Sequence, residues 1–389
     1  MKTSKATRDQ LKRHNRQLLL RAVYSGAADT RSALAAISGL AKPTVSDLIA
    51  EMIDEGLLME IGPGESTDSG GKRPTLLRFV PDARQVIGIS LDNGRAFGVL
   101  SNLAGRISAQ HYAELDSTQG EEAVRLLEEV INGLIAQLDA PLLCIGVGVP
   151  GVVESAAGLV RHSPPLGWID LPLADRLSPA YQVPVHIGNS AELTALAQFA
   201  FGINGEDHTR RLVTILISNS VEVGITLDRV AYHQGGDLSS LCIALPVATG
   251  EAHTAPLDAF IGWKAVQARM AALRQLHRGS IVPEGFTYLD IRHSAAEGDR
   301  AARQLCEELA GSLAQVFAWV IALLQPDHVS LAGPIVNLGE GFLAEIATRT
   351  GAIISPELTR AVVFSLAYSG NLSAIGGAAL ALQNELGIL

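Results

Sequence analysis

The chain has 389 residues, of which 48% are hydrophobic and 18% charged, a composition that excludes an intrinsically disordered protein and allows more than one domain. Its three cysteines, Cys144, Cys242 and Cys306, are far apart, which argues against a disulfide framework and a C-x-x-C zinc site. Residues 1–79 hold 12 Lys and Arg against 9 Asp and Glu, a net of +3, while the whole chain has −10. A small basic segment on an acidic body favours contact with a polyanion.

No targeting or membrane segment is expected. The polar, basic start MKTSKATRDQLKRHNRQ has no apolar signal-peptide region, and the longest apolar run, LAQVFAWVIALL, is too short to span a bilayer. These features predict a cytoplasmic protein with no membrane partner.

Three helices are predicted in the first 80 residues. The apolar residues of the first lie on one face: Leu11, Leu18, Leu19, Ala22 and Val23. Asp29 or Thr30 can cap a second, short helix that runs through Ile37, and a tight turn follows at residues 38–40. A third helix begins near Lys42, with Pro43 in its first turn, and ends at Gly56.

The outer face of the third helix divides into two halves of different charge. Its start presents Lys42, Thr44, Ser46 and Asp47, and its end presents Glu51, Asp54 and Glu55. Because DNA phosphates repel the acidic end, only the N-terminal half can enter a groove, as the recognition helix of a helix-turn-helix does. Asp47 is a candidate acceptor from a cytosine N4, or a group that discourages wrong sites.

A β-hairpin is predicted over residues 57–61 and 75–79, and its tip SGGKRP forms a basic wing suited to a minor groove. The candidate DNA-binding residues are therefore Lys42, Pro43, Thr44, Ser46, Asp47, Gly71, Lys72 and Arg73. A three-helix module that binds another protein is the alternative reading of this segment.

The remaining 310 residues alternate strands and helices. Strands are predicted at 86–93, 97–107, 142–153, 183–189, 212–217, 223–228 and 328–333, and helices at 120–138, 191–202, 260–276, 301–324 and 373–383. Each half begins with a hairpin and then alternates strand and helix, a pattern that predicts a two-lobed α/β protein with a cleft between the lobes.

Several segments, in chain order, resemble the repressor–ORF–kinase (ROK) family in its transcription-factor branch: RAVYSGAADTRSALAAISGLAKPTVSDLIAEMIDEGLL, SGGKRPTLLRFVPDARQVIGISLD, GVGVPGVV, SPPLGWIDLPLADRL, NSAELTALAQFAFG and GGAALAL. The resemblance implies an α/β fold with an N-terminal winged helix-turn-helix (residues 1–80) and an actin/hexokinase-like, ribonuclease H-like two-lobed ROK domain (81–389). Lobe 1 would comprise about 81–195 plus the C-terminal helix 373–389, and lobe 2 about 196–372. The family binds sugars or sugar phosphates in the cleft, its kinases also bind ATP, and many members hold zinc.

Both phosphate-binding turns of the family's kinases are altered in this chain. The Asp-x-Gly-Gly-Thr turn maps onto residues 92–96, where Arg95 and Ala96 replace Gly-Thr. The Gly-Thr-Gly-x-Gly-x-Gly turn maps onto SNSVEVG, residues 218–224, which keeps one glycine and adds Glu222. Side chains replace bare N–H groups and a carboxylate would face a phosphate, so no ATP site is expected.

The catalytic and zinc motifs of the family are also missing. Its Asn-Asp pair, whose Asp is the catalytic base, falls on Asn189-Ser190, and its Gly-Glu-x-Gly-His falls on residues 240–244. The zinc cysteines are absent, and Cys242 with His253 does not complete a site. We therefore expect no catalytic residue, no metal and no cofactor.

The expected function is a DNA-binding transcriptional regulator, a repressor of a carbohydrate-related operon, and not an enzyme. It would act as a homodimer or homotetramer on a double-stranded operator, with an atypical sugar or sugar derivative as effector. The candidate effector-binding residues are Asn189, Arg161, His162, Trp168, Glu192 and Glu222, each of which could equally be a packing or surface residue. A sugar kinase with a DNA-binding head, and a regulator whose ROK domain only dimerises, stay open as alternatives.

Overall fold

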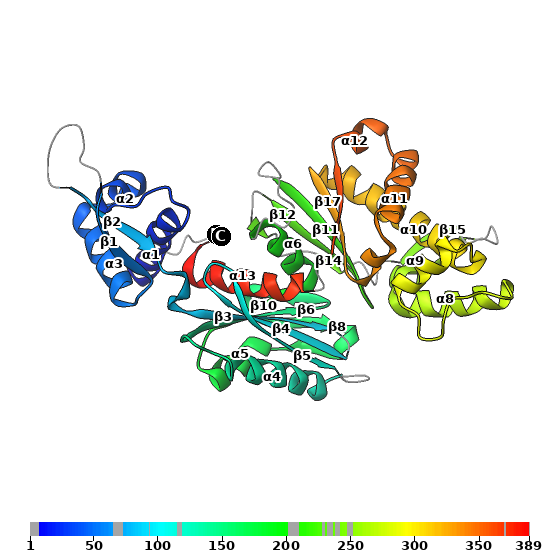
Figure 1. The fold of residues 1–389 in the computed structure, drawn as a ribbon, viewed down its shortest axis with the longest axis horizontal. Coiled ribbons are helices and arrows are strands. Elements are labelled where there is room, and N and C mark those ends of the chain that lie inside the picture. Colours follow the sequence, from blue (N-terminus) through cyan, green and yellow to red (C-terminus); the bar gives the residue numbers. More distant parts are fainter. Residues whose placement is uncertain are drawn as a thin grey trace.

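In the computed structural model the described residues are 8–64, 73–92, 94–114, 119–200, 210–227, 230–231, 236–237, 242–246, 252–368 and 371–388. They form an N-terminal helical head beside two lobes, each built on its own β-sheet (Figure 1).

The head contains the three predicted helices and the predicted hairpin: α1 (Arg8–Tyr24), α2 (Arg31–Ser38), α3 (Lys42–Asp54), β1 (Leu58–Pro63) and β2 (Thr75–Phe79). Of the two proposed caps of α2, Thr30 is the one used, because its hydroxyl accepts from the Ala33 N–H at 3.2 Å. Gly39 then adopts φ 69°, which a residue without Cβ reaches freely, and the chain turns by 120° between α2 and α3. That angle is the upper end of the helix-turn-helix range of about 90–120°.

The sheet of the first lobe has the order β10-β6-β3-β4-β5. Its strands are β3 (Gln85–Asp92), β4 (Arg95–Asn102), β5 (Ile107–Glu114), β6 (Leu142–Val149) and β10 (Val185–Asn189). β3, β4 and β5 form an antiparallel meander, and β6 and β10 lie parallel to β3. Helices α4 (Glu121–Ile135) and α5 (Leu173–Tyr181) cover one face, and α13 (Leu372–Leu386) covers the other (Figure 1).

The second sheet repeats this topology in the order β13-β12-β11-β17-β18, with β14 also paired to β12. Its strands are β11 (Arg211–Ile217), β12 (Val221–Leu227), β13 (Val230–Ala231), β14 (Gly236–Asp237), β17 (His328–Ala332) and β18 (Val363–Ala367). Again an antiparallel hairpin leads into parallel strands, since β17 and β18 run parallel to β11. The predicted duplication of hairpin and parallel strands is therefore confirmed.

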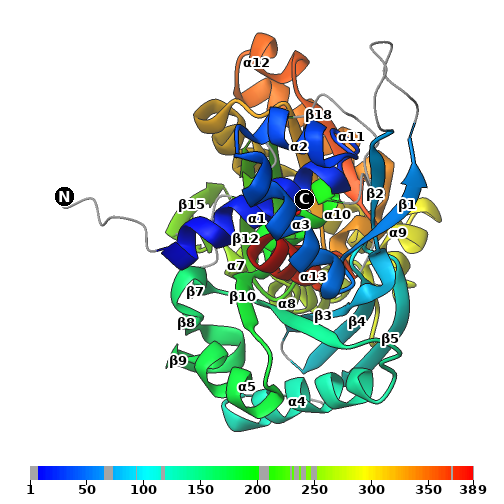
Figure 2. The ribbon, with the colours of Figure 1, turned by 90° about the vertical axis from the view of Figure 1, so that its left-hand side faces the viewer.

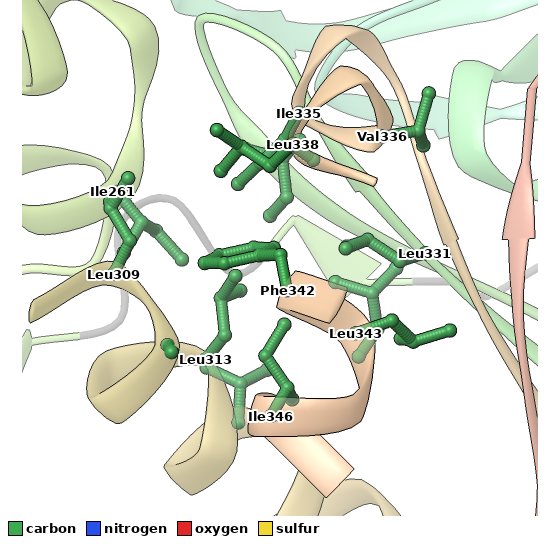
Figure 3. Packing of buried hydrophobic residues seen from close by; sticks show 14 of the residues in the cluster. Ile261, Leu309, Leu313, Leu331, Ile335, Val336, Leu338, Phe342, Leu343 and Ile346 are labelled. Atoms are coloured by element: carbon green, nitrogen blue, oxygen red, sulfur yellow. The ribbon is translucent and has the colours of Figure 1, made fainter. Parts of the chain in front are cut away.

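The helices of the second lobe enclose a large apolar core. They are α7 (Asp258–Ile261), α8 (Trp263–Leu276), α9 (Tyr288–Ala296), α10 (Arg300–Leu324), α11 (Glu340–Ile353) and α12 (Pro356–Arg360); β15 (Cys242–Pro246) and β16 (Ala252–Pro256) form a separate hairpin. Figure 3 shows Phe342 of α11 with Leu338 on one side and Leu313 of α10 on the other. Within the described chain, α10 alone is long and apolar enough to cross a membrane unaided, and half of its most apolar segment is buried in this core.

Two helices cross the region between the sheets. α6 (Ser190–Ala200) packs on β11 and β12 of the second sheet and on α13, which lies on the first sheet. A smaller sheet, β7 (Val152–Glu154), β8 (Leu159–Ser163) and β9 (Trp168–Leu171), follows the end of β6.

The head is packed onto the C-terminal end of α13 (Figure 2). One hydrophobic cluster includes Leu20 and Met52 of the head together with Leu382 and Leu386 of α13. Arg13, Gln17 and Arg21 of α1 donate to the main-chain carbonyls of residues 384, 385 and 387 at distances of 2.7–3.4 Å. These donors satisfy carbonyls that the end of a helix leaves without partners.

Candidate DNA-binding face and interlobe cleft

The N-terminal half of α3 presents a polar face to solvent. Lys42, Pro43, Thr44, Ser46 and Asp47 are all exposed, while the apolar residues on the opposite side of the helix are buried. The expected face is therefore accessible along the first turns of the helix.

Basic residues of α1 pair with acidic residues at the end of α3. Lys12 Nζ contacts Glu51 Oε1 at 2.7 Å, and Arg16 Nη1 donates to Glu55 Oε1 at 2.6 Å. Two of the carboxylates that would repel DNA are thus paired within the head. Of the wing candidates, Arg73 is exposed just before β2, and Gly71 and Lys72 lie outside the described residues.

A cleft of about 840 Å³ opens between the two lobes. It is lined by both turns that the family resemblance matches to phosphate-binding turns, through Asp92 and Arg95 of the first and Ser218 and Asn219 of the second. The lining also includes the first turns of α8, α9 and α13, the segment after β17 that contains Gly333 and Asn337, and Tyr368 after β18. None of the six effector candidates is among the described residues that line this cleft.

The first turn carries an exposed cluster of charges. Arg95 Nε contacts Glu114 Oε1 at 2.8 Å across β4 and β5. The hydroxyl of Tyr112, and then Arg95, lower the pKa of Glu114 by donating hydrogen bonds to its carboxylate. The arginine that replaces a glycine of the family motif is therefore paired with a carboxylate of its own lobe.

The second turn instead buries its carboxylate completely. Glu222 has no exposed surface, and its two oxygens accept from Asn189 Nδ2 and Ser220 Oγ, each at 2.7 Å. Asn189 also donates to Gly151 O at 2.8 Å, and its own oxygen accepts from the N–H of Ala191 at the start of α6. A buried carboxylate is tolerated only with such partners.

The packing around Gly224 requires a residue without a side chain. A Cβ at this position would lie 2.0 Å from Ala191 O, so β12 can approach α6 this closely only without a side chain there. Glu222 and Gly224 together join the second sheet to the end of β10 and the start of α6.

The polar contacts continue along α6. Gln198 Nε2 donates to Thr214 Oγ1 at 2.9 Å, and Thr214 Oγ1 lies 3.0 Å from Ser330 Oγ. All three side chains are buried. They link α6 to β11 and β17.

The other effector candidates lie apart from the cleft. Arg161 is exposed on β8 and pairs with Glu154 and Asp170, and its neighbour His162 is also exposed. Trp168 is 4% exposed in the core of the first lobe and donates its indole N–H to Gly120 O at 2.9 Å. Glu192 is buried as the third residue of α6. The structure brings together Asn189 and Glu222, and places Trp168 in the core.

Potential metal ligands are sparse. Among the residues the structure describes, no group of three or more His, Cys, Asp or Glu could hold a metal ion. In the β15–β16 hairpin, Cys242 pairs with Pro256 and His253 with Leu245, so the two stand at different register positions.

The lining residues that sequence reasoning missed include Lys264 of α8, Tyr288 of α9 and Ser373 of α13. α9 was not predicted, so Tyr288 had no assigned place. Lys264 could have been noticed as one of the chain's few lysines, next to Trp263 at the start of a predicted helix.

Two duplicated α/β lobes that enclose a cleft define the protein as an actin/hexokinase-like two-lobed protein, which here carries an N-terminal head of three helices and a β-hairpin. Residues 86–238 and 254–385 match the ROK family, and the chain belongs to it.

Known proteins resemble the chain over most of its length. The xylose repressor of Caldicellulosiruptor bescii is 26% identical over 352 residues, 86% of this chain and 87% of that protein. The crystal structure of a ROK family transcriptional regulator, a homolog of the E. coli MLC protein, aligns with a TM-score of 0.79 at 22% identity, covering 97% of this chain and 98% of that one. A ROK family glucokinase from Streptomyces griseus, in complex with glucose and AMPPNP, gives 0.65 at 20% identity over 77% and 99%.

Proposed function

We propose that this protein is a DNA-binding transcriptional regulator that represses a carbohydrate-related operon, and that it is not a sugar kinase. The observation that carries the proposal is the exposed, polar N-terminal half of α3, whose acidic end is paired within the head. The likeness to a xylose repressor over 86% of the chain supports the same function. The protein acts as a homodimer or homotetramer, which suits a palindromic operator.

Lys42, Pro43, Thr44, Ser46 and Asp47 face the major groove in this proposal, and Gly71, Lys72 and Arg73 form the wing. Residues 1–80 are the DNA-binding domain and 81–389 the ROK domain. Lys42 neutralises a phosphate, while Ser46 and Asp47 are within reach of base edges at the start of the recognition helix.

The absence of kinase activity is supported by the contacts of the second turn. Glu222 lies buried in that turn, held by Asn189 and Ser220, and Ser190 occupies the position that the family resemblance gives to the catalytic base. A serine has no base of its own to deprotonate a sugar hydroxyl. An ATP-dependent phosphorylation assay over a panel of hexoses should give no turnover; turnover at any hexose would overturn this part of the proposal.

α13 provides the path from effector to operator. Its first residues line the cleft and its last residues pack against the head. The helix has 15 residues, about 22 Å at 1.5 Å per residue. An effector that changes the separation of the lobes would therefore move the head through one rigid element.

Fluorescence anisotropy with duplexes tiling the protein's own promoter region tests the DNA-binding function. Lys42→Ala should weaken binding to every sequence about equally and reduce the slope of log K against log salt by about 1. Arg360→Ala, which removes an exposed cation from the second lobe, should leave both unchanged and is the matched control. If wild-type protein ignores all duplexes even at low salt, the proposal is wrong.

A further inference from the structure

α10 occupies in the second lobe the position that α4 occupies in the first. Each of these helices comes after the antiparallel hairpin of its lobe and leads into a parallel strand, β6 after α4 and β17 after α10. Both parallel strands lie beside the first strand of their sheet, β3 and β11 respectively. Because the topology is the same, a difference between the outward surfaces of the two helices is not imposed by the fold.

The outward face of α4 has the composition of a helix surface in contact with water. Its exposed residues include Glu121, Glu122, Arg125 and Glu129. Charged residues on the outer face and apolar residues on the inner face are the usual pattern of a surface helix.

The second half of α10 carries no charge. Residues 309–326, LAGSLAQVFAWVIALLQP, contain no Asp, Glu, Lys or Arg. Three large apolar side chains of this stretch are exposed, Trp319 at 37%, Leu323 at 81% and Leu324 at 39%. The core buries half of the most apolar segment of the helix and leaves the other half at the surface. A cluster of exposed apolar residues on a folded protein indicates a contact with another molecule.

The accessible residues of α10 repeat with the spacing of a packing seam. Ser312 and Gln315 are half-buried and Trp319 and Ala322 are exposed, so the steps along the chain are three, four and three residues. This is the 3.5-residue repeat of helices that pack side by side. The hydrogen bonds between α8 and α10 lie before this seam in the chain.

α11 lies beside α10 and presents a surface of small side chains (Figure 1). Its exposed residues include Ala344, Thr348 and Ala352, which are four residues apart and therefore lie on one face of the helix. The Thr348 hydroxyl donates to Ala344 O at 2.8 Å, so it is already satisfied. Arg349 Nε donates to Glu345 Oε1 at 2.6 Å, so these two charges neutralise each other. The surface thus combines large apolar residues on α10 with small residues on α11.

The charge of the protein favours a second copy of this chain as the molecule that covers this surface. Subtracting the +3 of residues 1–79 from the −10 of the whole chain leaves −13 for residues 80–389. Two such bodies repel each other unless they meet at a surface without net charge. A partner recognised by its charge would instead need a charged surface, which residues 309–326 do not provide.

We propose that two copies of this chain associate through α10 and α11 of the second lobe, about a two-fold axis. In such an interface each copy presents the same surface, so Trp319 and Leu323 of each α10 pack on the small residues of the opposite α11. Tryptophan is typical of interface centres, from which charged residues are depleted.

This interface suits a protein that binds DNA through its heads. Figure 1 shows α10 and α11 at the opposite end of the molecule from the head, so the exposed start of α3 stays free in both copies. The inference thereby names the partner of the proposed regulator, and it rests on the proposed function only in assigning two heads to one operator.

Sedimentation velocity on the full-length protein without DNA measures the association, and wild type should be a dimer at micromolar concentration. Leu323→Glu introduces a carboxylate from each copy into the uncharged contact and should weaken dimerisation about 100-fold. Because Leu323 is 81% exposed in the single chain, this variant should fold as wild type does. Leu276→Glu, the same change at a leucine of α8 that is 67% exposed, is the control and should dimerise as wild type does.

A second pair of variants repeats the test without removing a large side chain. Ala322→Glu adds the charge at an exposed alanine of the seam, and Ala272→Glu adds it at an exposed alanine of α8. Only Ala322→Glu should weaken dimerisation. A wild type that stays monomeric, or dimerisation that Leu323→Glu and Ala322→Glu leave unchanged, overturns the proposal. Equal weakening by the two α8 controls also overturns it, because net charge rather than this surface would then decide association.

The association test and the operator test can fail separately. If wild type dimerises and Leu323→Glu does not, but neither binds any duplex, the proposed function is wrong and the interface stands. If Leu323→Glu binds duplexes and sediments as the wild-type dimer does, the interface is wrong and the proposed function stands.

Discussion

The two turns that face the cleft occupy equivalent positions in duplicated sheets, yet they carry their charges in opposite ways. Arg95 of the β3–β4 hairpin is exposed and paired with Glu114 on the surface. Glu222 at the β11–β12 hairpin is fully buried and held by Asn189 and Ser220. The first hairpin thus carries a solvent-screened ion pair and the second a buried network, and only the buried network should matter for stability.

Replacing the buried carboxylate should give the largest effect. Glu222→Ala leaves the Asn189 amide and the Ser220 hydroxyl buried without their acceptor, and we expect a loss of about 3 kcal/mol in the free energy of unfolding. Urea unfolding followed by circular dichroism measures it. Glu222→Gln keeps the shape and one acceptor and should cost about 1 kcal/mol. A loss under about 0.5 kcal/mol for Glu222→Ala would mean that the network has no energetic role.

The next effect tests how far the network extends behind the second turn. Thr214→Val keeps the side-chain shape but removes the oxygen that accepts from Gln198 and contacts Ser330. We expect a loss of about 1–2 kcal/mol, less than for Glu222→Ala because Gln198 keeps a second acceptor, Thr194 O. The double variant Thr214→Val/Ser330→Ala should lose less than the sum of the singles. Strict additivity would show that the two hydroxyls are not coupled.

A third carboxylate, that of Glu385, is more buried than Glu114 of the first lobe and less buried than Glu222 of the second. It accepts from His186 Nε2 at 3.0 Å beneath the head, while His186 Nδ1 accepts from Asn384 Nδ2. His186 holds the pKa of Glu385 below its ordinary value of 4.5. The stabilisation is therefore fully present above the unfolded pKa and is lost as pH falls through the lowered folded pKa.

Glu385→Gln should consequently cost about 1 kcal/mol at pH 7, one partly buried hydrogen bond to a charged group. Below pH 4.5 the free energy of unfolding of this variant should also fall less steeply with pH than that of the wild type. Urea unfolding from pH 3 to 7 measures both effects. Glu129→Gln, an exposed carboxylate on α4 with no resolved contact, is the control. If the free energy of unfolding of Glu385→Gln falls with pH as steeply as that of the wild type, the contact with His186 does not contribute to stability.

The sequence predicted those parts of the fold whose signals are local. Thr30 caps α2, and Pro43 lies in the first turn of α3, within a few residues of the helix ends they mark. The buried strands β3, β6, β11 and β17 are short apolar runs that can be recognised without knowing their neighbours. α11 and β18, which were not predicted, have their apolar residues placed by packing against α10 and β17.

Site residues proved harder because their partners lie far along the chain. Glu222 meets Asn189 at a separation of 33 residues, and Trp168 meets Gly120 at 48. The residue types indicated polar or aromatic groups, but not whether these face a cavity or a core. Tyr288 reaches the cleft only because α9 packs beside Trp263, a contact that no local pattern reveals.

The smallest effect is expected at the exposed turn. Arg95→Ala removes the contact to Glu114, but both side chains stay in water, where the attraction is screened and the entropy of holding two long side chains offsets it. We expect no measurable change in urea unfolding at either low or high salt. Asn219, which lines the same cleft in the second turn, provides a matched control as Asn219→Ala. A clear, salt-dependent decrease in the free energy of unfolding of Arg95→Ala would contradict the difference between the two turns. The surface ion pair would then stabilise the first lobe much as the buried carboxylate stabilises the second.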